Sequence, residues 1–261
     1  MSFARIRVIL LLLNLLPFLL VPLLWPWSGA WAILLFLPPH LVLLYAIFYP
    51  SCQWLGPVQT RFQPAEPHQV WLTIDDGPSP QTPEILQLLD QYQATATFFL
   101  IGKNAKKFPE HVKAIQAAGH EIANHTQNHR SAFFWLLPQG YVQAEIQTAS
   151  HTLKSLTGTV PRRFRPPVGM KNPFIHPVLE WENLPCIGWS ARGFDTIISS
   201  PKKILRRILP DLSPGAIILL HEGRPHSLLT LHALLQTLQS QQLKTTIPTI
   251  PDTESEKYPP D

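Results

Sequence analysis

The first 60 residues carry almost no charge, and this feature constrains the fold more than any other. No Asp, Glu, Lys or Arg occurs between Arg7 and Arg61, a run of 53 residues. A soluble domain carries charge on roughly 25% of its residues. The apolar stretches at 8–24 and 30–49 are each close to the ~20 residues that cross a hydrocarbon core. We therefore expect residues 1–60 to be a membrane anchor with two transmembrane helices.

The segment between the two stretches suits a turn at a membrane surface. Trp25-Pro-Trp-Ser-Gly-Ala-Trp31 combines helix breakers with Trp rings, which settle at headgroup depth. A cleaved signal peptide is the alternative, because Arg5 and Arg7 resemble an n-region and Ala30-Trp-Ala32 fits a cleavage site. The length of the apolar run and the presence of a second stretch disfavour that alternative.

Arg5 and Arg7 also predict an orientation. Basic residues beside a span are retained in the cytoplasm, and two spans return the chain to the side on which it began. We expect a multi-pass protein of the cell membrane with the rest of the chain in the cytoplasm. A single span would instead place it on the exported side.

The charged residues lie almost entirely after residue 60, in a proportion that is typical of a soluble domain. We expect one such domain at 68–250. Beyond residue 60 lie 36 of the 38 charged residues. The net charge of +4 includes Arg5 and Arg7, so the domain carries only about +2, which is too little to indicate a nucleic-acid partner. Residues 251–261, rich in Pro and acid, are expected to form a disordered tail.

The domain alternates strand-like and helix-like runs. The candidate strands, rich in apolar and β-branched residues, are 70–74, 96–101, 120–123, 163–165, 186–189, 216–220 and 244–247. Apolar spacings of three and four predict helices at 83–92, 108–118, 138–156 and 201–209. Such alternation indicates an α/β fold with parallel strands, in which functional residues gather at the carboxyl ends of the strands.

Polar residues that could carry chemistry follow the first and third strands. Asp75 and Asp76 could divide base and cation-binding roles, although Asp-Gly-Pro is also ordinary turn chemistry. His125 and His129 are four residues apart and would face one way on a helical turn, as metal-binding pairs do. Asp76 with both imidazoles would supply three metal ligands and leave a position open for water.

Three later strands are also followed by chemically capable residues. Arg165, in Arg165-Pro-Pro-Val-Gly169, could clamp a carboxylate bidentately. The segment Trp189-Ser-Ala-Arg-Gly-Phe-Asp195 follows the fifth run. His221, which ends Leu219-Leu-His221, could act as a general acid.

The order of these five motifs resembles the polysaccharide deacetylase family, or NodB homology domain, over about residues 68–250. The resemblance implies a distorted (β/α) barrel of about seven strands and metal-dependent removal of acetyl from an N-acetylated sugar. It implies that Asp75 is the general base and that Arg165 orients it. It also implies one divalent metal ion, held by Asp76, His125 and His129.

The remaining roles implied by the resemblance concern the leaving group and the substrate. His221 would protonate the leaving amine, Asp195 would tune His221, and Leu219 would line the acetyl-methyl pocket. The fourth motif departs from the family pattern Asp-x-x-Asp-Trp, because Arg192 and Thr196 stand at two of its positions. Arg192 could pair with a phosphate or uronate of the substrate, or with a neighbouring acid of the protein. Together with Leu219 and Arg192, Pro166 is a candidate substrate contact.

The motifs and the resemblance leave the identity of the metal and of the substrate undecided. One carboxylate and two imidazoles suit zinc, but cobalt, nickel or manganese could use the same ligands. The 201–209 helix carries a basic face that could rest on anionic lipid headgroups or simply be solvated; its members are Lys202, Lys203, Arg206 and Arg207. The expected partners are membrane lipids and an N-acetylated carbohydrate, either lipid-linked or part of an envelope glycan. The alternatives are a deformylase of a lipid-linked aminosugar and a catalytically inactive carbohydrate-binding relative.

Overall fold

The apolar run that ends in two aspartates forms the central strand of a parallel sheet. In the computed structural model, which describes residues 3–249, β1 (Gln69–Gly77) lies between β2 (Ala96–Leu100) and β5 (Ile217–His221). The edges are β3 (Glu121–Asn124), beside β2, and β4 (Ala191–Arg192), beside β5; β6 (Lys244–Thr245) pairs with the start of β1. All of these pairs are parallel, which confirms the predicted α/β class. The tail predicted at 251–261 lies outside the described residues.

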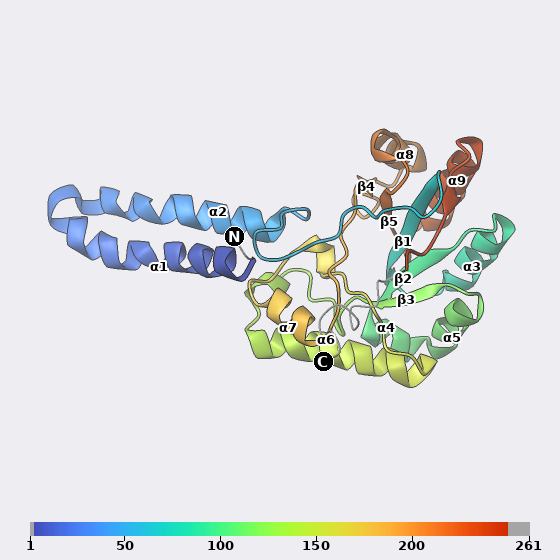
Figure 1. Ribbon diagram of the computed structural model, residues 1–261, viewed down its shortest axis with the longest axis horizontal. Helices are drawn as coiled ribbons and strands as arrows, with labels where there is room; N and C mark the ends of the chain where they lie inside the picture. Colours follow the sequence, from blue (N-terminus) through green and yellow to red (C-terminus); the bar gives the residue numbers. More distant parts are fainter. Residues whose placement is uncertain (1–2, 250–261) are drawn as a thin grey trace, which may run out of the picture.

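Helices connect the strands and cover one face of the sheet (Figure 1). The four predicted helices are present as α3 (Thr82–Gln91), α5 (Pro109–Ala117), α6 (Gln139–Thr157) and α8 (Pro201–Ile208). The structure adds α4 (Gly102–Lys107), α7 (Ile175–Trp181) and α9 (Ser227–Ser240). Alternate strand residues such as Leu72 and Ile74 pack against these helices, while Trp71 and Ile217 face the opposite side. That opposite face is the one on which the polar residues gather.

The barrel of about seven strands is not confirmed by the described residues. The predicted strands at 163–165 and 186–189 form only isolated bridges, from Phe164 to Asn124 and Cys186, and from Ile187 to Gln59. Prolines beside both segments remove the backbone donors that a longer ladder would need. These two segments therefore curve around the open face of the sheet without extending it as regular strands.

The N-terminal apolar region forms a helical hairpin that projects from the domain (Figure 1). It consists of α1 (Phe3–Ser28), a 3₁₀ segment (Gly29–Phe36) and α2 (Leu37–Phe48). The helix break predicted at Trp25–Trp31 is only partly right, because α1 continues to Ser28 and the chain reverses from Gly29, whose φ is 53°. The two arms touch where the rings of Phe18 and Phe36 lie 4.8 Å apart.

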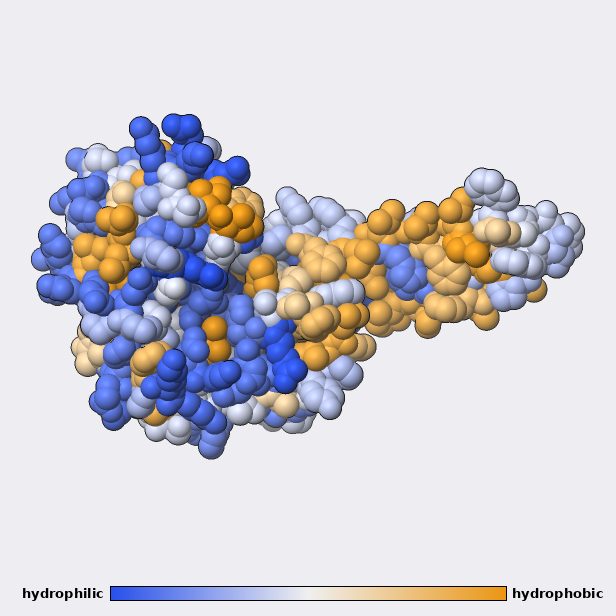
Figure 2. Space-filling view, turned by 180° about the vertical axis from the view of Figure 1, so that it is seen from behind, coloured by the Kyte–Doolittle hydropathy of each residue, from blue (hydrophilic) through white to orange (hydrophobic). Residues whose placement is uncertain are grey.

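The surface of the hairpin is apolar over most of its length, as Figure 2 shows. The helical segment Arg5–Phe48 is long and apolar enough to cross a membrane, by length and composition, and lies near the N-terminus. The prediction of two separate spans at 8–24 and 30–49 is not confirmed. The hairpin geometry does bring its two apolar arms side by side along most of their length.

The segment that follows the hairpin packs on the domain. The Lys171 ammonium donates to the carbonyls of Tyr49 and Pro50. Further along, the Gln59 N–H donates to the Cys186 carbonyl at 2.9 Å, and Val58 is buried in a core cluster. Residues 49–62 therefore form a strap from the hairpin across the domain.

Candidate active site

The two adjacent carboxylates both approach His125 because β1 bulges at its end. In a regular strand, neighbouring side chains point to opposite faces. Here the register between β1 and β2 shifts between Asp75 and Gly77, and Asp76 has a left-handed backbone with φ of 73°. The bulge turns the Asp76 carboxylate toward the histidines on the same side as Asp75. The Asn104 amide supports it by donating to the Asp76 carbonyl at 2.9 Å.

The predicted histidine pair is brought together, but not by a helical turn. Residues 125–130 are an irregular loop, with His129 at φ 50°, so the predicted helical geometry is wrong. The two imidazole rings still lie 4.7 Å apart. The loop is shaped by side chains: the Glu145 carboxylate accepts hydrogen bonds from the Asn128 N–H at 2.8 Å and from the Asn128 amide at 2.7 Å.

Asp76, His125 and His129 fit a metal ion. One ligand atom from each lies within 4.8 Å of the others. The Nε2 atoms of His125 and His129 are 3.6 and 3.3 Å from Asp76 Oδ1, which is buried and has no hydrogen-bond partner among the described residues. The His125 Nδ1 lies 2.8 Å from the Arg165 carbonyl, so Nδ1 carries the proton and Nε2 presents its lone pair. Burial holds the pKa of His125 well below its usual value, which keeps this imidazole neutral.

Asp75 is held as a buried carboxylate by Arg165. The guanidinium NH1 donates to Asp75 Oδ1 at 2.6 Å and to the Thr73 hydroxyl at 2.8 Å. NH2 and Nε donate to the Gly188 and Ile187 carbonyls at 2.8 and 3.1 Å, so the guanidinium is fixed on several sides. The contact to Asp75 is through one nitrogen, so the predicted bidentate clamp is a single hydrogen bond.

His221 lies next to Asp75, on the neighbouring strand of the sheet. The two residues are register partners on β5 and β1. The Asp195 carboxylate accepts from His221 Nδ1 at 2.9 Å and from the His221 N–H at 2.7 Å. Burial lowers the pKa of His221, but the hydrogen bond and charge of Asp195, with the charges of both aspartates on β1, outweigh it and raise the pKa. An imidazole with a raised pKa and a carboxylate thus lie side by side on neighbouring strands.

The predicted substrate contacts lie around this pair. Leu219 is two residues before His221 on β5 and is buried on the same face, and Pro166 follows Arg165 and is also buried. Arg192 is the register partner of Leu219. Its guanidinium lies between aromatic rings, not in an ion pair with Asp195 or Glu222 among the described residues.

Glu145 and Glu222 are supporting residues that the motifs alone do not reveal. Glu222 Oε2 accepts from the hydroxyls of Ser79 and Thr82 at 2.8 and 2.7 Å and so fastens the loop after Asp76. Glu145 is buried on α6 beside Val142 and Ile146. A carboxylate on the apolar face of a predicted helix is the signal that could have identified it.

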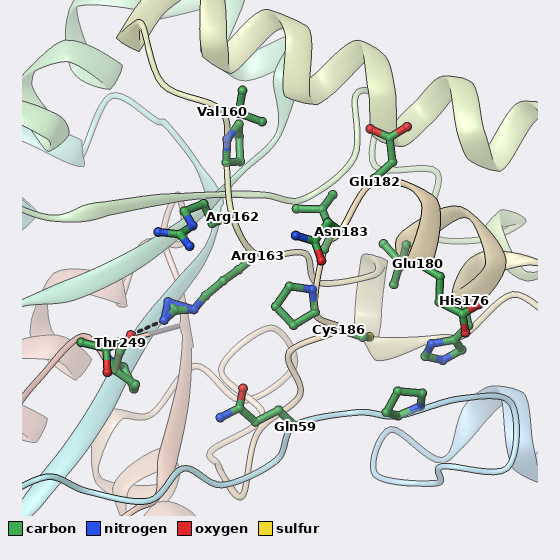
Figure 3. A pocket seen from close by; sticks show the side chains of 16 residues that line it. Gln59, Val160, Arg162, Arg163, His176, Glu180, Glu182, Asn183, Cys186 and Thr249 are labelled. Carbon is green, nitrogen blue, oxygen red and sulfur yellow. Dashed lines mark hydrogen bonds between the residues drawn. The ribbon is translucent and has the colours of Figure 1, made fainter. Parts of the chain in front are cut away.

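A separate hollow of about 570 Å³ lies away from these residues (Figure 3). The hollow lies where the segments 163–165 and 186–189 begin, whereas the site lies where they end. Its lining includes Arg163, Glu180 and Cys186. Arg163 is already engaged there, donating to Glu121 at 2.7 Å. This hollow contains none of the catalytic candidates.

Comparison with known proteins matches this geometry to one family. Residues 63–180 match the family model described as polysaccharide deacetylase. A chitooligosaccharide deacetylase of Bradyrhizobium sp. (strain ANU 289) is 35% identical over 158 residues, which cover 60% of this chain and 71% of that protein. A peptidoglycan-N-acetylglucosamine deacetylase of Bacillus cereus is 36% identical over 157 residues, 59% of this chain and 55% of that protein.

Solved structures extend the likeness to the three-dimensional fold. A CE4 family pseudoenzyme from Bacillus anthracis superposes with a TM-score of 0.65 at 26% identity, covering 71% of this chain and 65% of that one. A mutant of that protein is described as having restored enzymatic activity. The fold is therefore shared by proteins with and without enzymatic activity.

Proposed function

This chain belongs to the polysaccharide deacetylase family of hydrolases, and we propose that it removes the N-acetyl group from an N-acetylhexosamine unit of a lipid-linked sugar or envelope glycan. The observation that carries the proposal is the register pairing of Asp75 with His221, beside three side chains that can hold a metal ion. A base and an acid are thus available side by side on neighbouring strands.

The chain's own residues supply the proton transfers. Asp75, held in place by its ion pair with Arg165, accepts the proton of the attacking water. His221, kept protonated by Asp195, donates a proton to the amine as the amide bond breaks. Asp76, His125 and His129 would hold a divalent ion, which would polarise the amide carbonyl and lower the pKa of water.

The nitrogen-rich ligand set favours zinc. Imidazole and carboxylate ligands with an open position are typical of catalytic zinc, while cobalt, nickel and manganese accept the same donors. Leu219 and Pro166, both buried beside the acid and the base, are proposed to bound the space for the acetyl group and sugar.

We propose that the hairpin anchors the protein in the cell membrane with the domain on the cytoplasmic side. Its exposed apolar surface and the basic residues at its start support this arrangement. An anchored enzyme meets a substrate in the same bilayer at high effective concentration, which favours a lipid-linked sugar over a soluble polymer. Hydrolysis of an N-formyl group is the second candidate, since the two acyl groups differ by one methyl.

Two variants test the reaction. Asp75→Asn should retain the metal and lose about 10²–10⁴-fold in turnover, because it neutralises a base and spares the ligands. His125→Ala should lose both turnover and the bound metal. The assay follows acetate and formate released from N-acetyl and N-formyl hexosamine substrates, with elemental analysis of each protein.

Two results would contradict this assignment. Turnover of Asp75→Asn within threefold of the parent would remove the base role. Equal, near-stoichiometric metal in the parent and His125→Ala would remove the ligand role. If metal-loaded protein binds these sugars but releases neither acetate nor formate, the result would support the alternative of a catalytically inactive carbohydrate-binding relative.

A further inference from the structure

Arg192 is a cation beside the site that the proposed reaction leaves unused. It ends β4, and its register partner on β5 is Leu219, two residues before His221. Its guanidinium carbon lies 4.5 Å from the ring centre of Phe194 and 5.0 Å from that of Trp189. The planar cation is thus held by stacking on aromatic rings.

No acidic side chain neutralises Arg192 directly. Its Nε is buried without a hydrogen-bond partner, and no described residue forms an ion pair with the guanidinium. Burial lowers the pKa of Arg192, whereas the charges of Asp195 and Asp75 raise it, so the side chain lies within electrostatic reach of the site. A half-buried cation without a direct partner is costly to maintain and is a natural contact for an anionic ligand.

A second cation shares the same aromatic ring. The Arg207 guanidinium carbon lies 5.5 Å from the ring centre of Phe194. Phe194 itself is 38% exposed and has a φ of 59°, a left-handed conformation that is rare for an aromatic residue. Strained residues of this kind persist where the surrounding structure enforces them, and they concentrate at functional sites.

The rest of α8 adds positive charge without adding contacts. Its buried face is formed by Ile204 and Ile208, and its other basic side chains are exposed: Lys202, Lys203 and Arg206. None of them forms an ion pair within residues 3–249. The charge of this helix therefore makes the electrostatic potential around Arg192 and Arg207 more positive.

We propose that Arg192 and Arg207, both packed on Phe194, bind an anionic group of the substrate, a phosphate or a carboxylate, next to the sugar that loses its acetyl group. Guanidinium groups match these anions in geometry and can donate two parallel hydrogen bonds. The inference rests on the proposed deacetylation and narrows its substrate class from N-acetylated sugars to those with a negative group nearby.

The test compares three N-acetylated substrates that differ in charge. The substrates are a neutral N-acetylglucosamine oligomer, a phosphodiester of N-acetylglucosamine, and an oligomer containing the carboxylate of N-acetylmuramic acid. The variants are Arg192→Gln and Arg207→Gln, with Lys202→Gln as the matched control on the same helix. Arg207 is exposed, so its replacement perturbs folding little.

The measured quantity is the ratio of kcat/KM for each anionic substrate to that for the neutral one. For the recognised anion, this ratio should fall at least about tenfold in Arg192→Gln, as expected when a charge-assisted hydrogen bond is lost. The fall should be smaller but in the same direction in Arg207→Gln and absent in Lys202→Gln. Arg192→Lys should recover only part of the preference, because it keeps the charge and loses the planar fork.

The anion that shows the effect identifies the source, phosphate or carboxylate. Wild-type protein that hydrolyses these substrates with ratios unchanged in both arginine variants would overturn the anion site while leaving the deacetylase proposal intact. An equal loss on neutral and anionic substrates would also overturn it, because the role would then be structural. Wild-type protein inactive on all three substrates would contradict the proposed function itself.

Discussion

Asp195 is the residue that sets the protonation of His221. Its carboxylate accepts two hydrogen bonds from that residue, at the ring and at the backbone. Because the pKa of His221 is raised mainly through this neighbour, the acid stays protonated to higher pH than an isolated imidazole would. If His221 is the general acid as proposed, its environment sets the upper pH limit of turnover.

Asp195→Asn should move the alkaline limb of the kcat/KM profile to lower pH. The neutral amide can still accept from the backbone N–H but no longer favours the imidazolium. The measurement is the pH dependence of kcat/KM, with metal content as the control. An alkaline limb that stays in place would show that a different group supplies the proton.

Glu222, which is buried next to the site, makes the stability of the fold depend on pH. Burial raises its pKa to about 7, although the Ser79 and Thr82 hydroxyls oppose the rise. The folded protein therefore retains this proton at pH values where the unfolded chain has lost it. Stability from this group is full below the ordinary carboxyl pKa of 4.5 and falls as the pH rises toward about 7.

Glu222→Gln should flatten that pH dependence. The amide mimics the protonated acid, so between pH 4.5 and 7 the variant should lose less stability than the parent. Denaturant unfolding of chelator-treated protein at several pH values measures the difference. Parallel curves for the two proteins would show that Glu222 ionises as readily in the fold as in the unfolded chain.

At the scale of elements, the strap ties the hairpin to the loops that carry the site. The Trp135 ring, in the loop after His129, lies 5.3 Å from the Phe48 ring at the foot of α2. Lys171, in the loop after Arg165, donates to carbonyls of the strap. The foot of the hairpin therefore buttresses two loops of the site.

Two truncations should separate the anchor from the strap. A chain that begins at residue 50 keeps Val58 and Phe62 buried and should fold with metal bound. A chain that begins at residue 64 loses both, at about 1.5–3 kcal/mol for each buried side chain. Thermal unfolding and metal content measure the outcome. Equal stability of the two chains would mean that the strap only links the anchor to the domain, as the boundary predicted at residue 60 implies.

At the scale of the whole molecule, the hairpin and the domain form an elongated shape with one apolar arm (Figures 1 and 2). The arm exposes large apolar side chains along both helices, including Leu12, Leu19, Leu41 and Tyr45. Surface of this extent is unfavourable in water and is matched by a lipid environment. The polar domain would then stand at the membrane surface with its rim of basic residues in water.

Reporter fusions should place both the domain and the N-terminus in the cytoplasm. A reporter that is active only outside the cytoplasm should be inactive after Asp261 and active at Ser28, the end of α1. Activity after Asp261 would place the domain on the exported side. It would also shift the favoured substrate from a lipid-linked precursor to an external glycan.

The sequence by itself predicted five of the strands, four of the helices and the polar residues that gather at one edge of the sheet. Apolar and β-branched runs predicted these strands, and apolar spacings of three and four predicted the helices, because burial leaves such patterns in the order of the residues. The motifs after strands predicted Asp75, Asp76, His125, His129 and His221, because carboxyl ends of parallel strands meet at one edge.

Only the tertiary structure decided how these side chains meet. A bulge with positive φ, which local pattern does not encode, turns Asp76 to the side of Asp75. The loop of His129 takes its shape from Glu145, a distant residue on α6, and not from a helical turn. Arg192 is joined on the ring of Phe194 by Arg207, which comes from α8. Such contacts join residues far apart in sequence or depend on backbone strain, so they are settled only when the whole domain packs.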